Sequence, residues 1–298
     1  MTLVSPFVRA VAALAPGLLL CAAFADLTAG SRVHAGARIT TRKADTKGGV
    51  LIVMYHNFGS AENRYTRSYR HFREDLENFY SLGFRPVTMS QYLANRMPLP
   101  PGASPVVITM DDSAPTQFAV DRKGRIDPHC AVGMWRAFAK THPDFPVRGT
   151  FYVLPPIMWD QHAWRHHKVR LLKTWGSELA CHTWSHRALR YQSDDSAARE
   201  YGRSSEFLKG LGFPQPSLAF PYGIYPRHMA LLKGFKWKGK KYKFTGAVTC
   251  NPDLAPYPSF ASKHPYELNR IEARRGYLAL DYWMPEFKRN LHRLYVMP

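Results

Sequence analysis

The sequence has few cysteines and few acidic residues, and each shortage excludes a class of protein. Only 4 of its 298 residues are cysteines, and one of them lies in an apolar leader, so at most one disulfide can form among Cys130, Cys181 and Cys250. A disulfide-built scaffold is therefore excluded. Asp and Glu number 22 against 41 Lys and Arg, which gives a net charge of +19. The positive electrostatic field of such a chain favours binding to anionic surfaces, such as acidic polysaccharide, envelope phosphates or nucleic acid.

Long hydrophobic runs are also scarce. The first 25 residues carry one positive charge, Arg9, no acid, an apolar stretch and small residues near Ala25. This pattern predicts a signal peptide over 1–25. No later segment reaches the roughly 18–20 apolar residues that span a bilayer. We therefore expect an exported chain, periplasmic or secreted, with no integral membrane segment after signal removal. Residues 26–48 are polar and basic, which is typical of a flexible lead-in.

Repeats and low-complexity tracts are absent. From residue 49 onward, short apolar runs such as 50–55, 106–110 and 178–181 alternate with amphipathic stretches such as 69–82 and 193–211. Runs of the first kind are typical of buried strands and those of the second kind of helices. The alternation predicts an α/β domain over 49–298 with a parallel sheet, open or closed into a barrel.

Polar side chains follow the expected strands at the points where the strands end. They are His56, Asp111, Asp112, His182, His186 and Tyr222. The carboxyl ends of parallel strands meet on one face, so these side chains are expected to gather there. One carboxylate and two imidazoles form a facial ligand set for a divalent metal. A spare carboxylate can then take a proton from water. The pattern predicts a metal-assisted hydrolase.

Each half of this pattern also has a structural interpretation. An Asp-Asp pair commonly forms a turn or a helix start. A His-x-x-x-His pair places both rings on one face of a helical turn, and it also arises by chance in a chain with 13 histidines. A second such pair, His162 and His166, has no strand directly in front of it, so we expect it to be solvated. Cys181 precedes His182, and we expect a buried thiol there rather than a ligand.

A lysine-rich run lies at 233–243. It holds six lysines, no acid and three aromatic residues. Aromatic rings among cations can stack on sugars or bases. The alternative, which we favour from the sequence, is a solvated loop before a strand at 244–248.

Three motifs resemble those of the polysaccharide deacetylases, carbohydrate esterase family 4. They are Thr109-Met-Asp-Asp-Ser113, His182-Thr-Trp-Ser-His186 and Ala219-Phe-Pro-Tyr-Gly223. The segments 54–57 and 82–87 are similar to the branch that removes N-acetyl groups from exported poly-N-acetylglucosamine. The resemblance implies a distorted (β/α) barrel with about seven parallel strands.

The resemblance also implies roles for the residues at the strand ends. Asp112, His182 and His186 would hold a divalent metal, with zinc as the expected ion. Asp111 would be the general base, and the backbone N–H of Tyr222 would stabilise the oxyanion. The general acid would be His56, as in the poly-N-acetylglucosamine branch. The alternative acid is His292, in a terminal Leu291-His-Arg run.

Departures from the family pattern bear on the site. Met110 replaces an aromatic residue and Ser113 replaces glycine. Ala219 stands where the third motif commonly has the arginine that pairs with the base. Arg270 resembles an arginine of related members that can do that work, and a surface salt bridge is an equally expected alternative for it.

The expected function is therefore metal-dependent removal of acetyl groups from an exported or envelope polysaccharide that contains N-acetylglucosamine. Two alternatives stay open: an O-acetyl esterase acting on a glycan such as acetylxylan, and a non-catalytic basic glycan-binding protein. No nucleic-acid partner is expected, because no nucleic-acid-binding motif occurs. The sequence leaves the oligomeric state open.

Overall fold

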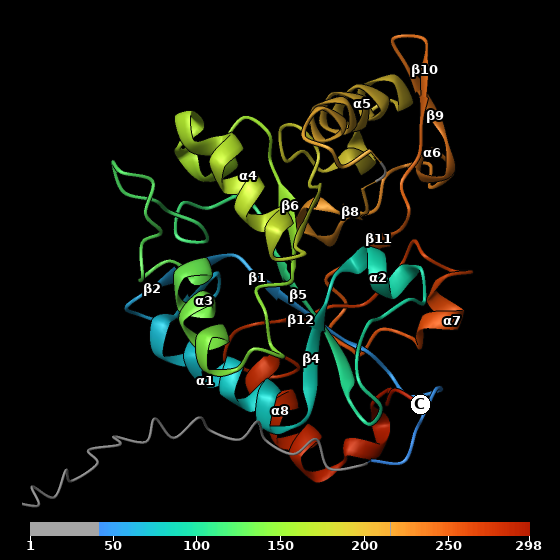
Figure 1. Ribbon diagram of the computed structural model, residues 1–298. Coiled ribbons are helices and arrows are strands. Elements are labelled where there is room, and N and C mark those ends of the chain that lie inside the picture. The colour runs from blue at the N-terminus through green and yellow to red at the C-terminus, as the bar shows by residue number, and fades with distance from the viewer. Residues whose placement is uncertain (1–41, 215) are drawn as a thin grey trace, which may run out of the picture. The chain divides into compact units, whose positions relative to one another are not determined.

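The computed structural model describes residues 42–214 and 216–298 (Figure 1). The expected signal peptide and residues 26–41 of the expected lead-in lie outside the described residues. Residues 42–48 pair with the C-terminal segment: the N–H of Asp45 donates to the carbonyl of Val296 at 3.1 Å. The Arg42 guanidinium also donates to the Ser104 hydroxyl at 2.8 Å. This part of the expected flexible lead-in is thus fixed to the domain.

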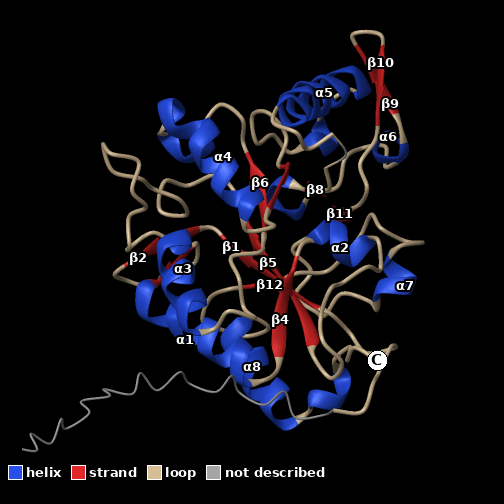
Figure 2. Ribbon diagram, viewed as in Figure 1, coloured by secondary structure: helices blue, strands red, loops and turns tan. Residues whose placement is uncertain are grey.

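One parallel sheet carries the fold (Figure 2). Its strand order is β11 (Ala247–Val248), β8 (Leu218–Ala219), β7 (Glu178–Cys181), β6 (Thr150–Val153), β5 (Ser104–Met110), β1 (Leu51–Tyr55) and β12 (Ile271–Glu272). An eighth strand, β4 (Phe84–Val87), pairs with the first half of β5. The last two residues of β5, Thr109 and Met110, pair with β6 instead. The curled row of seven parallel strands confirms the predicted distorted (β/α) barrel.

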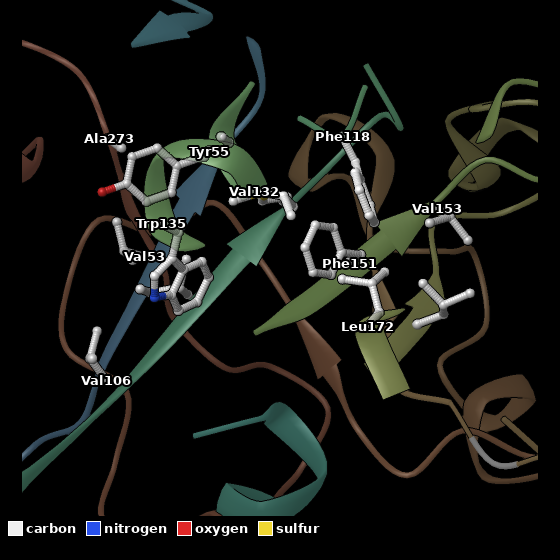
Figure 3. Packing of buried hydrophobic residues seen from close by; sticks show 14 of the residues in the cluster. Val53, Tyr55, Val106, Phe118, Val132, Trp135, Phe151, Val153, Leu172 and Ala273 are labelled. Atoms are coloured by element: carbon white, nitrogen blue, oxygen red, sulfur yellow. The ribbon is translucent and has the colours of Figure 1, made fainter. Parts of the chain in front are cut away.

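Successive residues of each strand point to opposite faces of the sheet, and both faces are buried. Val53, Trp135 and Phe151 belong to the larger cluster, between the sheet and the outer helices (Figure 3). Those helices are α1 (Tyr69–Ser81), α3 (Ala131–Thr141), α4 (Arg165–Thr174), α5 (Asp194–Gly210) and α8 (Leu280–Arg289). Short helices α2 (Met89–Leu93) and α7 (Pro258–Ala261) contribute to a second cluster on the inner face. Burial on both faces explains why the main strands are mostly apolar rather than alternating.

Helix starts agree with the local sequence. The Ser68 hydroxyl accepts the N–H of His71 at the start of α1, and Thr88 and Gln91 form a reciprocal capping box at α2. None of the helices in the described part of the chain is long and apolar enough to cross a bilayer. The remaining elements are β2 (Asn57–Gly59), β3 (Thr66–Ser68), α6 (Ala230–Lys233), η1 (Met158–Asp160), η2 (His162–Trp164), η3 (Leu189–Tyr191), η4 (Pro221–Gly223) and η5 (Leu291–Arg293).

The lysine-rich run is a hairpin, so the favoured interpretation of it as a solvated loop was wrong. Strands β9 (Phe235–Trp237) and β10 (Lys240–Tyr242) pair antiparallel across a turn at Lys238 and Gly239, both with positive φ. Such a turn matches the twist of paired strands. Phe235 and Tyr242 are cross-strand partners with stacked rings 5.6 Å apart. This aromatic pair, rather than the lysines, decides the local structure.

Candidate active site

The residues predicted from the strand ends lie together. His56 follows β1, Asp111 and Asp112 follow β5, His182 follows β7, and Tyr222 lies in η4 just beyond β8. All of them, with His186, line one pocket of about 620 Å³. Because these strands are parallel, their carboxyl ends deliver the six side chains to the same edge of the sheet.

Three side chains form a candidate metal site. The Nε2 atoms of His182 and His186 lie 3.1 and 3.2 Å from the same Oδ1 of Asp112. In the described ranges this is the only group of His, Cys, Asp or Glu arranged for metal binding, and its ligand atoms lie within 4.8 Å of one another. The Ala219 carbonyl lies 2.9 Å from Nδ1 of His182. Donation of the Nδ1 proton to that carbonyl leaves the Nε2 lone pair facing the carboxylate.

Either a proton on Nε2 of His182 or a cation can lie between the ring and the carboxylate oxygen. Burial alone would lower the pKa of His182, but Asp111 and Asp112 raise it, so the site attracts positive charge. The donor set therefore fits a divalent ion with nitrogen and oxygen ligands, such as zinc. The charges of the cluster point the same way. Burial alone would raise the pKa of Asp112, but its hydrogen bond and charge interaction with His182 lower that pKa to about 2. Burial and the neighbouring His182 together lower the pKa of His186 and favour its neutral, ligating form.

The loop that carries both histidines is a turn, not the helical turn that the His-x-x-x-His spacing predicted. Thr183 and His186 have left-handed φ values of 68° and 57°. The Glu200 carboxylate on α5 accepts the N–H groups of Trp184 and Ser185, at 3.1 and 2.8 Å. Glu200 thereby holds the loop in a shape that brings the two imidazole rings to a centroid distance of 4.8 Å.

The Asp-Asp pair is also a strained turn. Asp112 and Ser113 have φ values of 71° and 59°, a region that non-glycine residues enter at a cost of about 1–3 kcal/mol. Ser113 occupies the position where the family pattern has glycine. Its hydroxyl accepts the N–H of Leu154, just beyond β6, at 2.9 Å. The serine therefore ties the aspartate turn to the neighbouring strand.

Arg270 reaches Asp111 inside the barrel. Its two terminal nitrogens donate to the two Asp111 oxygens, each at 2.8 Å, and both residues are 1% exposed. Arg270 is thus buried and does not form a surface salt bridge. Burial alone would raise the pKa of Asp111, but the charge and hydrogen bonds of Arg270, together with the charge of His182, outweigh burial and lower that pKa. Asp111 therefore stays ionised. Arg270 approaches Asp111 in place of the arginine missing at Ala219.

His56 lies in the pocket beside Tyr65, with ring centroids 5.4 Å apart. Gln117, which no sequence motif marked, joins it to Asp111. The Gln117 amide donates to the backbone carbonyls of both His56 and Asp111, at 2.8 Å to the former. Its own oxygen accepts the indole N–H of Trp159 at 3.3 Å. The amide thus links the ends of β1 and β5.

The backbone places His292 at the other end of the sheet. His292 lies in η5, whose Arg293 carbonyl accepts the N–H of Gly49, two residues before β1. His56 follows the opposite end of that strand. At about 3.3 Å per residue the two ends are roughly 20 Å apart. This placement favours His56 as the histidine beside Asp111.

The second histidine pair and the cysteines lie outside the site, apart from one thiol at its rim. His162 and His166 are exposed, on η2 and α4, as predicted. Cys181 is buried in β7 and is not among the grouped ligands, which confirms the predicted core thiol. Cys250 lines the pocket, and neither it nor Cys130 forms a disulfide.

Comparison with known proteins agrees with this geometry. Residues 100–236 match the family model described as polysaccharide deacetylase. No curated protein matches the chain. Among solved structures, the chain is similar to the Streptococcus pyogenes deacetylase PplD in complex with acetate, at 18% identity and a TM-score of 0.56, covering 80% of this chain and 98% of that one.

Two further structures share the fold. IcaB from Ammonifex degensii is 18% identical with a TM-score of 0.51, covering 81% of this chain and 96% of that one. A de-N-acetylase from Aggregatibacter actinomycetemcomitans is 14% identical with a TM-score of 0.51, covering 78% and 98%. The family match spans the aspartate pair, the histidine loop and the Pro221-Tyr-Gly223 turn. Residues 100–236 therefore form a polysaccharide deacetylase domain, and the chain shares the fold of solved deacetylases.

Proposed function

We propose that this protein removes N-acetyl groups from a polysaccharide that contains N-acetylglucosamine, and that it requires a divalent metal, with zinc as the expected ion. One observation carries the proposal: Asp112, His182 and His186 converge within 4.8 Å beside Asp111, a second carboxylate held ionised by Arg270. A metal-ligand set next to a fixed base is the arrangement that amide hydrolysis at neutral pH needs.

Each group of residues in the pocket has a separate role in the proposed reaction. Asp112, His182 and His186 would hold the divalent ion, which would supply Lewis acidity for the acetyl carbonyl and would lower the pKa of water to roughly 7. Asp111 accepts the proton of the attacking water, and Arg270 fixes the orientation of its carboxylate. His56, which also lines the pocket, donates a proton to the leaving amine.

The oxyanion requires a hydrogen-bond donor as well. The N–H of Tyr222 has no acceptor within the described residues, and it belongs to a turn whose φ is 59°. The Tyr222 ring packs over His186 at 4.5 Å between centroids, which fixes the turn beside the metal ligands. An unpaired backbone donor at that place can stabilise the charge that develops on the acetyl oxygen.

The amide substrate is proposed from two similarities. The motif spacing resembles the poly-N-acetylglucosamine branch, and the fold is shared with a structure described as a de-N-acetylase. We further propose that the protein acts outside the cytoplasm, because residues 1–25 have the pattern of a signal peptide.

The test is acetate release from N-acetylglucosamine oligomers by the purified protein, after chelation and after zinc is added back. Asp111→Asn is assayed alongside, with His166→Ala as the matched control because His166 is exposed and outside the site. We expect release that needs the metal, is lost in Asp111→Asn and survives in His166→Ala. Release from acetylxylan but not from these oligomers would identify an esterase. Absence of bound metal would overturn the proposal.

A further inference from the structure

A second hollow, of about 580 Å³, lies outside the catalytic pocket. It is formed by α5, by the β9–β10 hairpin that lies next to α5 in Figure 1, and by the loop between the two candidate metal ligands. Its lining includes three aromatic residues, Trp184, Phe207 and Trp237, and three cations, Arg199, Arg203 and Lys238.

The close approach of the hairpin to α5 depends on a glycine. Trp237 lies against Gly202 in the middle of the helix, and a Cβ at Gly202 would stand 2.4 Å from Cγ of the indole. Glycine within a helix is unfavourable by about 1 kcal/mol relative to alanine. At this position it lets the indole rest on the helix backbone. The aromatic wall of the hollow is therefore part of the packed structure.

Two of the cations have no carboxylate partner. The side chains of Arg199 and Arg203 are exposed and make no hydrogen bond or ion pair with any described residue. The Arg203 guanidinium nonetheless has a defined place, 4.0 Å from the centroid of the Trp184 ring. Stacking of this kind restrains the group and leaves its N–H donors available for a carboxylate.

The third cation, Lys238, shares one acidic neighbour, Glu206, with Lys240. Lys238 lies 4.3 Å from the Trp237 ring centroid, and Glu206 is within 3.9 Å of Lys238 and 3.3 Å of Lys240. One carboxylate therefore faces two lysines, and the wider hairpin contributes further lysines without another acid. The hollow has a net positive charge beside aromatic surface.

We propose that this hollow is a second carbohydrate-binding site and that it takes an acidic polysaccharide chain bearing carboxylates. Aromatic rings bind the apolar faces of sugars, and restrained guanidinium groups bind carboxylates. The aromatic side chains are partly buried and line a hollow rather than protrude, which suits a polymer strand better than a membrane surface. A polysaccharide is favoured over a nucleic acid because the same chain carries a polysaccharide deacetylase domain.

The site lies directly behind the catalytic loop. Trp184 is two residues from both His182 and His186, and Glu200 holds its backbone from α5. The three side chains of this loop thus serve two surfaces: the histidines face the catalytic pocket and the indole lines the second hollow. A bound polymer is therefore retained next to the site of hydrolysis, although its binding does not depend on the reaction.

The test is affinity electrophoresis of the purified protein in gels that contain polygalacturonate, hydroxyethyl cellulose or duplex DNA. The variant Arg199→Ala/Arg203→Ala is compared with Lys43→Ala/Lys263→Ala, which removes the same charge from exposed positions on other segments. We expect retention by polygalacturonate alone, weakened about tenfold by the arginine variant and little changed by the lysine variant. Trp237→Ala, which keeps every charge, is expected to weaken it as well.

Three outcomes would overturn the proposal. If the arginine variant is retained as strongly as the native protein, the hollow does not bind polygalacturonate. Equal weakening in both double variants would show that only the overall charge matters. Retention by DNA as strong as by polygalacturonate would identify a general polyanion surface. Acetate release from a short neutral oligosaccharide should be unchanged in the arginine variant, so loss of binding is separable from failure of the catalytic proposal.

Discussion

Arg270 and Asp111 lie 159 residues apart in the sequence and form a bidentate pair with both N–O distances at 2.8 Å. Both side chains are almost fully buried, at 0% and 2% exposure, although Asp111 borders the catalytic pocket. Removing one partner leaves the other as a buried uncompensated charge, which is strongly destabilising.

The first prediction follows from this pair. Arg270→Met is expected to lower the free energy of unfolding by about 3–5 kcal/mol and to abolish acetate release. The double variant Asp111→Asn/Arg270→Met should lose less stability than the sum of the two single variants, because their partners are no longer left unpaired. Urea titrations of the four proteins measure the coupling. Additive losses would mean that the two side chains do not stabilise each other.

The second prediction concerns the metal ligands. His186→Ala is expected to weaken zinc binding at least about 100-fold, since loss of an outer-shell partner alone weakens metal sites roughly 10–100-fold. His166→Ala should leave zinc binding unchanged, because His166 is exposed on α4. Metal content after dialysis against a zinc buffer measures both. Equal zinc content in the two variants would remove His186 from the ligand set.

The third prediction concerns Gln117. Gln117→Met keeps the side-chain length but removes the amide that joins the His56 and Asp111 carbonyls. We expect kcat to fall about 10–100-fold with little change in KM, because a small displacement of catalytic groups is costly. Steady-state kinetics and a thermal unfolding curve are measured together. A fall in Tm with unchanged kcat would assign Gln117 a purely structural role.

The fourth prediction concerns acid stability. Glu62 is partly buried, which alone would raise its pKa, but the Ser68 N–H, His71 and Arg67 outweigh burial and lower that pKa to about 2 from an ordinary 4.5. Because the folded-state pKa is depressed, this stabilisation is complete above pH 4.5 and is lost as pH falls through about 2.

Glu62→Gln is therefore expected to be less stable than the native chain at pH 7, by on the order of 1–2 kcal/mol once solvent screening is allowed for. The difference should shrink as pH falls from 4.5 towards 2. Urea unfolding at pH 7 and pH 3 measures it. A difference that is equal at the two pH values would show that the Glu62 charge is not involved.

The main strands and the site residues were predictable because burial on both faces leaves a visible signature. β1, β5, β6 and β7 are mostly apolar, and a charged residue or histidine that directly follows such a run is conspicuous. β12, with two residues, has no such signature. The hairpin was hidden because lysines outnumber the aromatic residues that fold it.

Contacts between residues far apart in the sequence were harder to predict than the positions of strands and site residues along the chain. The sequence left Arg270 between two interpretations, because nothing local shows that its strand returns to the barrel beside β1. Gln117 has no local signal, since its partners are backbone carbonyls. The turn at Thr183 and His186 could not be predicted, because left-handed φ values in non-glycine residues leave no trace in composition.

The order of these segments along the chain also constrains how the protein is made. Arg270, the counter-charge of Asp111, is synthesised 159 residues after it, so a nascent chain that ends before Arg270 holds a carboxylate with no partner in a folded interior. Premature termination products should therefore remain unfolded and be removed by proteolysis rather than persist as inactive metal-binding fragments. The buried ion pair of the site can form only after the ribosome has passed Arg270.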